Sequence, residues 1–196
     1  MNIVRKSSFR TSPWKNGGGT TFEALRVPDA GEAFRWRVSV AEVASSGPFS
    51  DFSGYRRQMV LLRGAGVRLR FGAARETVLR AVGDRVEFDG AEPTQCELLA
   101  GPCTDLNLIV ADGIDCTEAQ VQSLAAPFVW AADLSEVQLL FVIAGGVELA
   151  DAEGAKARLD PWDLAWRRPG NPPLAGLAPL SSPEHAMVFL ARFVDA

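Results

Sequence analysis

Histidine and cysteine are scarce in this sequence, and their scarcity limits the metal chemistry it can support. The 196 residues include one histidine, His185, and three cysteines with no C-x-x-C spacing: Cys96, Cys103 and Cys116. Imidazole and thiolate are the ligands that zinc and most other first-row metals prefer. We therefore expect no metal site and no cofactor. We interpret the cysteines as reduced thiols rather than as a disulfide framework.

An excess of basic residues and a long apolar run are also missing. The formal net charge is −4, whereas a protein that binds nucleic-acid phosphates needs a basic face. No run approaches the roughly 18 apolar residues of a membrane helix, and Met1 to Lys6 lacks the apolar core of a signal peptide. We expect a cytoplasmic protein that binds neither nucleic acid nor membranes. Its apolar content of 47% is typical of a globular chain.

Two common catalytic and nucleotide-binding signatures are absent as well. No G-x-S-x-G elbow accompanies His185, so a lone surface histidine is favoured over a serine triad. The glycine-rich stretch from Trp14 to Thr21, W-K-N-G-G-G-T-T, matches neither the phosphate loop nor the dinucleotide fingerprint, and Lys15 precedes its glycines. Either it is a flexible turn, or its glycines allow a close approach of the backbone to a ligand.

What the sequence does contain is a series of short strand patterns. From Phe34 to Ala44 apolar and polar side chains alternate, with aromatic and β-branched residues on one face. Similar runs bounded by Gly, Pro or Asp predict further strands at residues 57–62, 67–71, 77–81, 85–88, 96–99 and 106–110. Short strands with turn signals every 8 to 12 residues or so indicate a sandwich or barrel.

One helix is predicted, from Glu118 to Ala126. Thr117 and Gln120 have the spacing of a T-x-x-Q capping box, and Pro127 ends the segment. Because this helix is short, we expect it to connect two units.

The strand pattern begins again after this segment. Residues 139–149 repeat the pattern of 59–69 with Gly66 and Gly146 in register, 161–165 follow 82–86, and 187–191 follow 106–110. We interpret this as an internal duplication rather than a chance match of apolar runs. Each half looks like a cupin barrel. The predicted fold is all-β, a double-barrel cupin (bicupin): residues 1–115 form an N-terminal barrel with the glycine-rich loop, and residues 116–196 form the connecting helix and a C-terminal barrel.

Five motifs in the first 110 or so residues together resemble the HutD/Ves family. They are W-K-N-G-G-G-T at 14–20, F-x-W-R-V-S-x-A at 34–41, G-P-F-S-x-F at 47–52, G-Y-x-R at 54–57 and D-L-N-L at 105–108. The resemblance implies a two-barrel cupin fold. For the histidine-utilisation members it also implies a regulatory role in histidine catabolism, through binding of a small pathway acid such as formylglutamate or urocanate. Ser53 and Arg56 depart from the family pattern.

A pocket that binds an anion is the chemistry these residues best support. Strand alternation groups Arg37 with Ser39, Arg57 with Met59, and Asp105 with Asn107, and paired arginines suit a small carboxylate. The full set of candidate ligand-binding residues is Trp14, Asn16, Gly18, Thr20, Glu23, Arg37, Ser39, Phe49, Arg57, Met59, Asp105 and Asn107. Alternatively, the arginines lie on the outer face in ordinary ion pairs, because periodicity does not say which face is buried.

We expect a metal-free protein that binds a small carboxylate metabolite, rather than an enzyme. Two alternatives stay open: a cofactor-independent isomerase or hydrolase that uses Glu23 or Asp105 as general base, and a protein-interaction module. In the second half, Trp162 and Trp166 with the neighbouring arginines could form a second pocket or a contact in a homodimer, although such residues more often fill the core.

Overall fold

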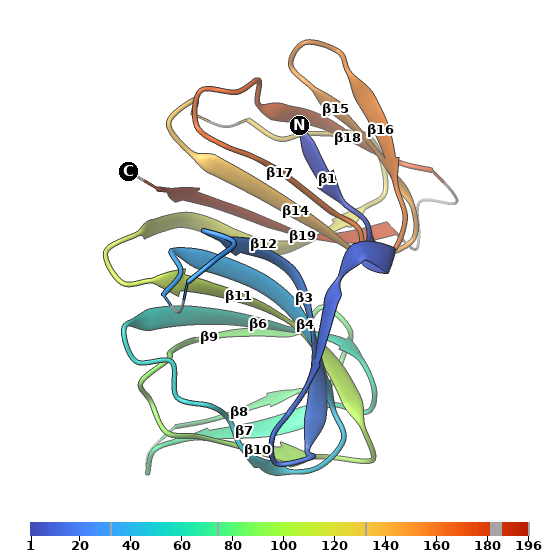
Figure 1. Ribbon diagram of the computed structural model, residues 1–196. Coiled ribbons are helices and arrows are strands. Elements are labelled where there is room, and N and C mark those ends of the chain that lie inside the picture. Colours follow the sequence, from blue (N-terminus) through green and yellow to red (C-terminus); the bar gives the residue numbers. More distant parts are fainter. Residues whose placement is uncertain (32, 74, 132, 181–185, 196) are drawn as a thin grey trace. The chain divides into compact units, whose positions relative to one another are not determined.

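The computed structural model describes residues 1–31, 33–73, 75–131, 133–180 and 186–195, and its regular structure is almost entirely β-strand (Figure 1). The all-β class is therefore confirmed. The chain divides into two compact units: Phe9–Gly113, called the 9–113 unit below, and Met1–Ser8 with Ile114–Ala196, called the C-terminal unit. The expected first domain, residues 1–115, ends near this boundary. However, its first eight residues belong to the C-terminal unit.

The 9–113 unit consists of two antiparallel sheets. The larger has the strand order β2 (Arg10–Pro13), β3 (Gly19–Val27), β4 (Trp36–Val43), β11 (Cys103–Ala111), β6 (Tyr55–Arg63) and β9 (Arg85–Asp89). The smaller has the order β5 (Gly47–Pro48), β10 (Thr94–Leu98), β7 (Val67–Phe71) and β8 (Arg75–Leu79). Side chains from both sheets form one hydrophobic core, with Met59 and Leu61 of β6 against Leu69 of β7. The burial of this core holds the two layers together.

The C-terminal unit is also built from two antiparallel sheets. One has the order β1 (Asn2–Val4), β17 (Leu164–Arg167), β14 (Val137–Ala144), β19 (Ala186–Val194) and β12 (Asp115–Leu124). The other has the order β13 (Phe128–Val129), β18 (Leu174–Pro179), β15 (Val147–Asp151) and β16 (Lys156–Leu159). The short 3-10 turn η1 (Lys6–Ser8) follows β1, and Arg5 Nη1 donates to Asp163 Oδ2 at 2.6 Å. These contacts attach the N-terminal segment to the C-terminal unit.

The predicted connecting helix is wrong, because most of Glu118 to Ala126 lies in strand β12. β12 pairs with β19 from Asp115 to Leu124, with a bulge near Thr117. The hydroxyl expected to cap a helix donates instead to Glu136 Oε1 at 2.6 Å, and Glu118 forms an ion pair with Arg192. Long-range pairing along the whole segment therefore outweighs the local capping signal. Among the described residues no helix has the length and apolar character needed to span a membrane.

The two units share one topology, as the predicted duplication requires. Strands β4 to β11 of the 9–113 unit correspond in order and pairing to β12 to β19. β11 and β19 both have nine residues and begin 83 residues apart, at Cys103 and Ala186, rather than the 81 that the sequence match suggested. Leu61 and Val142 lie 81 residues apart and make equivalent backbone hydrogen bonds. Each donates its N–H to the second residue of a turn, at 84 or 163, and accepts at its carbonyl from the N–H of the first, at 83 or 162. These offsets identify equivalent positions in the two units.

Candidate functional site

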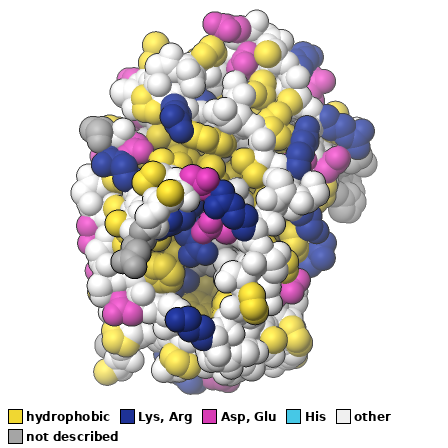
Figure 2. Space-filling view, viewed as in Figure 1, with side chains coloured by type: hydrophobic (Ala, Val, Ile, Leu, Met, Phe, Trp, Pro, Cys, Tyr) yellow, Lys and Arg dark blue, Asp and Glu magenta, His cyan; other side chains and the backbone are white. Residues whose placement is uncertain are grey.

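The 9–113 unit contains a cavity of about 540 Å³. Strands β4, β6 and β11 supply one wall, and the segments before β3 and around β5 supply the rim. Its lining residues are Pro13, Trp14, Lys15, Asn16, Thr21, Arg37, Ser39, Ala41, Pro48, Phe49, Ser50, Phe52, Arg57, Asp105, Asn107 and Ile109. In Figure 2, Lys and Arg side chains and hydrophobic side chains surround a hollow in the lower half of the face shown.

Arg57 is the buried cation of this cavity. Its position on β6, two residues before Met59, directs it to the inner face of the sheet, where it is 6% exposed. The guanidinium lies 5.3, 5.2 and 4.8 Å from the ring centroids of Phe49, Phe52 and Phe88, within the range of cation–π contact. Its Nη2 donates to Asn107 Oδ1 at 2.7 Å, whereas Nε has no hydrogen-bond partner.

Asp105 is the matching buried acid. It is 1% exposed, and its Oδ1 accepts a short hydrogen bond from Asn107 Nδ2, so that Asn107 connects it to Arg57. Its Oδ2 has no hydrogen-bond partner. Among the described residues, this oxygen and Arg57 Nε are the two buried side-chain polar atoms without a partner. A buried polar atom without a hydrogen-bond partner lowers the stability of a protein by about 1 to 3 kcal/mol. Both atoms therefore favour a ligand or water in the cavity.

Burial governs the protonation of this pair. It raises the pKa of Asp105 to about 7, although Arg57 and the hydrogen bond from Asn107 act in the opposite direction. Burial also lowers the pKa of Arg57 to about 10; Asp105 opposes this change and the nearby Arg37 adds to it. Arg57 is therefore a cation at neutral pH, and Asp105 is close to its midpoint.

Arg37 supplies a second positive charge on the same wall. It lies on β4 in line with Ser39 and Ala41, and all three line the cavity, while Trp36 and Val38 lie on the opposite face. The face of β4 that carries Arg37, Ser39 and Ala41 is therefore the one toward the cavity. Arg37 Nε donates to Glu23 Oε2 at 2.7 Å, and about a fifth of each side chain is exposed. This pair holds the guanidinium in place but leaves it accessible to solvent.

The glycine-rich stretch forms the hairpin between β2 and β3, at the edge of the cavity. Trp14 N–H donates to Gly19 O at 2.9 Å, and Trp14 Nε1 donates to Thr21 Oγ1 at 2.8 Å, which fixes the indole at the rim. A Cβ atom on Gly19 would lie 2.3 Å from Glu42 O. The close approach that the glycines provide is therefore made to a neighbouring strand, and it positions Trp14 and Asn16 beside the cavity.

The structure brings together eight of the twelve predicted site residues as cavity lining: Trp14, Asn16, Arg37, Ser39, Phe49, Arg57, Asp105 and Asn107. Glu23 acts through its ion pair with Arg37, and Gly18 and Thr20 lie in the hairpin outside the lining. Met59 is fully buried in the hydrophobic core and is not among the lining residues. His185 lies outside the described residues.

Sequence reasoning missed two lining residues with a clear structural role. Phe52 contacts the Arg57 guanidinium, and Thr21 holds the Trp14 indole. Both lie in or beside motifs quoted above, at the ends of the 47–52 and 14–20 segments. A rule that treats every aromatic or hydroxyl residue of those motifs as a candidate would have found them.

At the equivalent position of the C-terminal unit, a glutamine hydrogen-bonded within the protein stands in place of the arginine. By the offsets above, Gln138 replaces Arg57, and Val188 and Leu190 replace Asp105 and Asn107. Gln138 Nε2 donates to Leu174 O at 2.9 Å, and its Oε1 accepts from Leu174 N–H and from Arg167.

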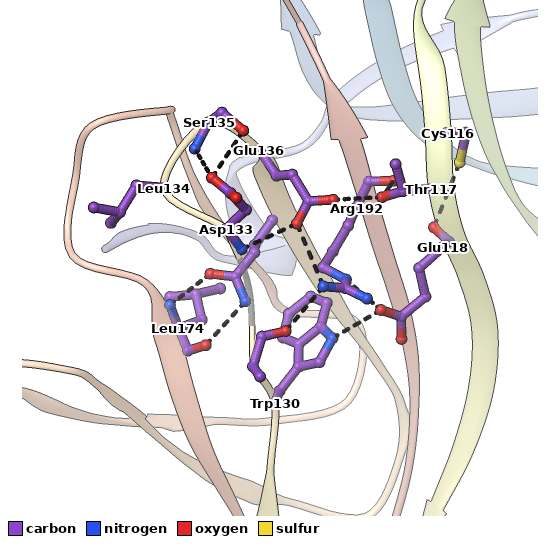
Figure 3. A network of polar contacts seen from close by, with 12 residues as sticks. Cys116, Thr117, Glu118, Trp130, Asp133, Leu134, Ser135, Glu136, Leu174 and Arg192 are labelled. Carbon is purple, nitrogen blue, oxygen red and sulfur yellow. Dashed lines mark hydrogen bonds and ion pairs between the residues drawn. The ribbon is translucent and has the colours of Figure 1, made fainter.

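Trp130, equivalent to Phe49, is 3% exposed in the core of the C-terminal unit, and its Nε1 donates to Glu118 at 3.2 Å (Figure 3). Only the 9–113 unit combines buried Arg, Asp and Asn at this position within the part of the chain that the structure describes.

Metal-binding groups do not gather at this cavity. No cluster of three or more His, Cys, Asp or Glu residues with metal-binding geometry occurs in the described ranges. Burial raises the pKa of Cys96 and of Cys103, in the core of the same unit, to about 12, so both are neutral thiols near pH 7. The arrangement is suited to hydrogen bonding and charge recognition.

Comparison with known proteins identifies one relative described by its place in a hutC 3′ region and others named Ves. An uncharacterised 21.2 kDa protein in the hutC 3′ region of Pseudomonas putida is 34% identical over 186 residues, 90% of this chain and 91% of that protein. Protein Ves of Citrobacter koseri is 33% identical over 140 residues, 70% of each chain.

Solved structures show the same fold over nearly the whole chain. A conserved protein of unknown function from Pseudomonas aeruginosa PAO1 has a TM-score of 0.88 with 32% identity, covering 99% of this chain and 98% of that one. HutD from Pseudomonas fluorescens SBW25, in a formate condition, has a TM-score of 0.78 with 26% identity, covering 97% of each chain. A mutant of Bacillus subtilis oxalate decarboxylase, 10% identical, has a TM-score of 0.67 over 98% of this chain and 77% of that one, which shows a cupin-like fold alone.

The HutD family model matches residues 6–181, nearly the whole chain. Together with the relatives above, this match confirms the resemblance carried by the five sequence motifs. The chain belongs to the HutD family.

Proposed function

We propose that this protein binds a small carboxylate metabolite in the cavity of the 9–113 unit and thereby modulates amino-acid utilisation, histidine utilisation in particular. The observation that carries the proposal is the buried Arg57, which lines the cavity with its Nε unpartnered. Arg37 adds a second cation on the same wall. A guanidinium presents parallel N–H donors that match the two oxygens of a carboxylate.

The family relationship supports the metabolic context of this proposal. One relative is described by its place in a hutC 3′ region, and one solved relative is named HutD. Formylglutamate and urocanate are therefore the first acids to test, in the metal-free protein. In this proposal the two units are the halves of a bicupin, of which only the 9–113 unit keeps a ligand site.

A thermal-shift screen tests the binding directly. Formylglutamate, urocanate, glutamate and formate are added to the protein, and a ligand at 100 times its dissociation constant stabilises the fold by about 2.7 kcal/mol. Arg57→Gln introduces the residue that the C-terminal unit has at this position, and it should abolish the shift. Arg56→Gln is the matched control, because Arg56 is exposed and pairs with Glu87. No shift with any acid, or an equal shift in both variants, contradicts the proposal.

A cofactor-independent isomerase or hydrolase is the second candidate, and one observation favours it. Asp105 lies beside Arg57, and its pKa of about 7 suits a general base near neutral pH. Glu23, the other acid considered, is held by Arg37 and lies outside the lining. Turnover of any of the four acids that is lost in Asp105→Asn would favour the enzyme over the binding protein.

A further inference from the structure

The charges around the cavity balance before any ligand enters. Arg57 and Asp105 form one buried pair of opposite groups, and Arg37 and Glu23 form a second pair at the edge. Glu23 also lies 4.0 Å from Arg10, whose exposed charge is screened by solvent. Lys15, which also lines the cavity, is exposed at the rim, where its charge is screened by solvent. With all four inner groups ionised, their sum is zero, so a carboxylate that enters adds one uncompensated negative charge to a buried site.

The hydrogen-bonding groups of the site also disfavour a carboxylate ligand while Asp105 is ionised. Arg57 Nε is a hydrogen-bond donor without a partner. Asp105 Oδ2 also has no partner, and in the ionised carboxylate it can only accept a hydrogen bond. A ligand carboxylate also only accepts. It therefore satisfies Arg57 but faces the oxygen of Asp105 with no proton between them, which is unfavourable in a buried site.

A proton on Asp105 removes both problems. The protonated carboxyl can donate from Oδ2 to an oxygen of the ligand, while Oδ1 keeps the hydrogen bond from Asn107. The charge of the inner groups with one bound carboxylate then returns to zero. Burial already moves Asp105 toward the protonated form, since its pKa lies near 7 in the free protein.

We propose that the cavity binds its carboxylate ligand together with one proton, which Asp105 takes up from solvent and holds in the complex. This inference rests on the proposed function and adds a dependence on pH to it. Binding then weakens about tenfold for each pH unit above the midpoint of free Asp105, because the protein must first be protonated.

Three other titratable groups interact electrostatically with Asp105, and their pKa values lie well above neutral pH. Arg57 on β6 has its pKa near 10, and the thiols of Cys103 on β11 and Cys96 on β10 have theirs near 12. Arg37 on β4 and Glu23 on β3 form an ion pair with each other. Of Asp105, Arg57 and the two thiols, Asp105 is thus the group whose pKa lies between pH 5 and pH 8.

Titration calorimetry in buffers of different ionisation enthalpy counts the protons directly. Formylglutamate and formate are titrated into the protein in Hepes, Tes and Tris at pH 8 and in piperazine and N-methylpiperazine at pH 5, because a carboxylate or phosphate buffer would compete for the site. The slope of the observed enthalpy against the buffer enthalpy should show close to one proton taken up per ligand at pH 8 and almost none at pH 5. This arm needs no variant, so it does not depend on the stability of a substituted protein.

Two substitutions identify the group. Asp105→Asn, whose amide is a permanent donor, should remove the proton uptake and the pH dependence while it keeps binding. Asp112→Asn is the control with the same charge change at an exposed residue outside the cavity, and it should behave like the wild type. Binding without proton uptake at pH 8, or uptake that persists in Asp105→Asn, overturns the inference and leaves the proposed function standing. If neither formylglutamate nor formate binds to the wild type, the inference and the proposed function are both overturned.

Discussion

Trp162 occupies in the C-terminal unit the backbone position that Gly83 occupies in the 9–113 unit. Gly83 N–H donates to Leu61 O at 2.9 Å and Trp162 N–H donates to Val142 O at 2.7 Å, with φ angles of 91° and 76°. A positive φ is natural for glycine and unfavourable for a residue with a Cβ. The turn has therefore kept its geometry although its glycine has been replaced by a buried tryptophan.

At position 162 the glycine variant should be more stable than the alanine variant, which is the reverse of the order expected at most positions. Both Trp162→Gly and Trp162→Ala should lose several kcal/mol, about 3 to 5, because the buried ring is removed. Glycine should nevertheless be the more stable of the two by up to about 1 kcal/mol, since it adopts the positive φ without strain. Urea unfolding of both variants measures the difference. At Trp130, which is buried with φ in the ordinary range, alanine should be the more stable.

Gly19→Ala should destabilise the protein by about 1 to 3 kcal/mol in urea unfolding. The new Cβ would lie 2.3 Å from Glu42 O, a backbone atom of the paired strand that cannot move without disturbing the sheet. Gly47→Ala is the control, because a Cβ at that position meets no atom within 4 Å. Equal stability of the two variants would show that the approach of β3 to β4 is looser than the structure indicates.

Asp105 should make the wild type less stable as the pH rises from about 4 to about 7. Its pKa is raised by burial, so the folded state keeps a proton that the unfolded chain releases near pH 4; the stabilisation is complete below that value and is lost through pH 7. Each unit of pKa displacement corresponds to about 1.4 kcal/mol. The stability of Asp105→Asn minus that of the wild type, from urea unfolding at pH 5 and pH 8, should therefore increase by a few kcal/mol. A constant difference would contradict a buried, titrating Asp105.

Arg167→Met should destabilise the C-terminal unit by roughly 3 kcal/mol or more and leave acid binding unchanged. Arg167 is fully buried and donates to Gln138 Oε1 and to the carbonyls of Asp133, Leu134 and Asn171. Its removal breaks these four hydrogen bonds from a charged donor, and hydrogen bonds to charged groups contribute about 1.5 to 3 kcal/mol each. Arg168→Met, at an exposed neighbour, should change the stability by less than about 1 kcal/mol. Lost acid binding in a folded Arg167→Met protein would mean that the C-terminal unit contributes to the site.

Strands with strong local patterns could be predicted from the sequence, and those defined by distant partners could not. The expected strand at 67–71 has the bounds of β7, and the alternation from Phe34 contains β4. The segment Thr117 to Leu124 also alternates, but its polar side chains gave a capping signal, and only the pairing with β19 shows that it is a strand. β1 was not expected in the C-terminal unit, because its pairing with β17 joins residues more than 150 positions apart.

The candidate site could be predicted only in part, because its contacts also depend on residues that are distant in the sequence. Alternation grouped Arg37 with Ser39 and Arg57 with Met59 correctly, yet it could not show how deep each residue lies between the sheets. Arg57 lines the cavity, whereas Met59 lies in the hydrophobic core. The contact of Phe52 and Phe88 with Arg57 brings together residues from a loop and from β9, and no spacing in the sequence indicates it.

The three phenylalanine rings around Arg57 also affect the thermodynamics of recognition. An exposed arginine loses about 2 kcal/mol of rotamer freedom when it is fixed by a ligand, but this guanidinium is already held by the rings and by Asn107. Its side-chain entropy is therefore lost during folding and not during association. In the proposed complex, a metabolite of only a few heavy atoms, which can gain at most about 1.5 kcal/mol per atom, meets a preorganised receptor and keeps most of that gain as affinity.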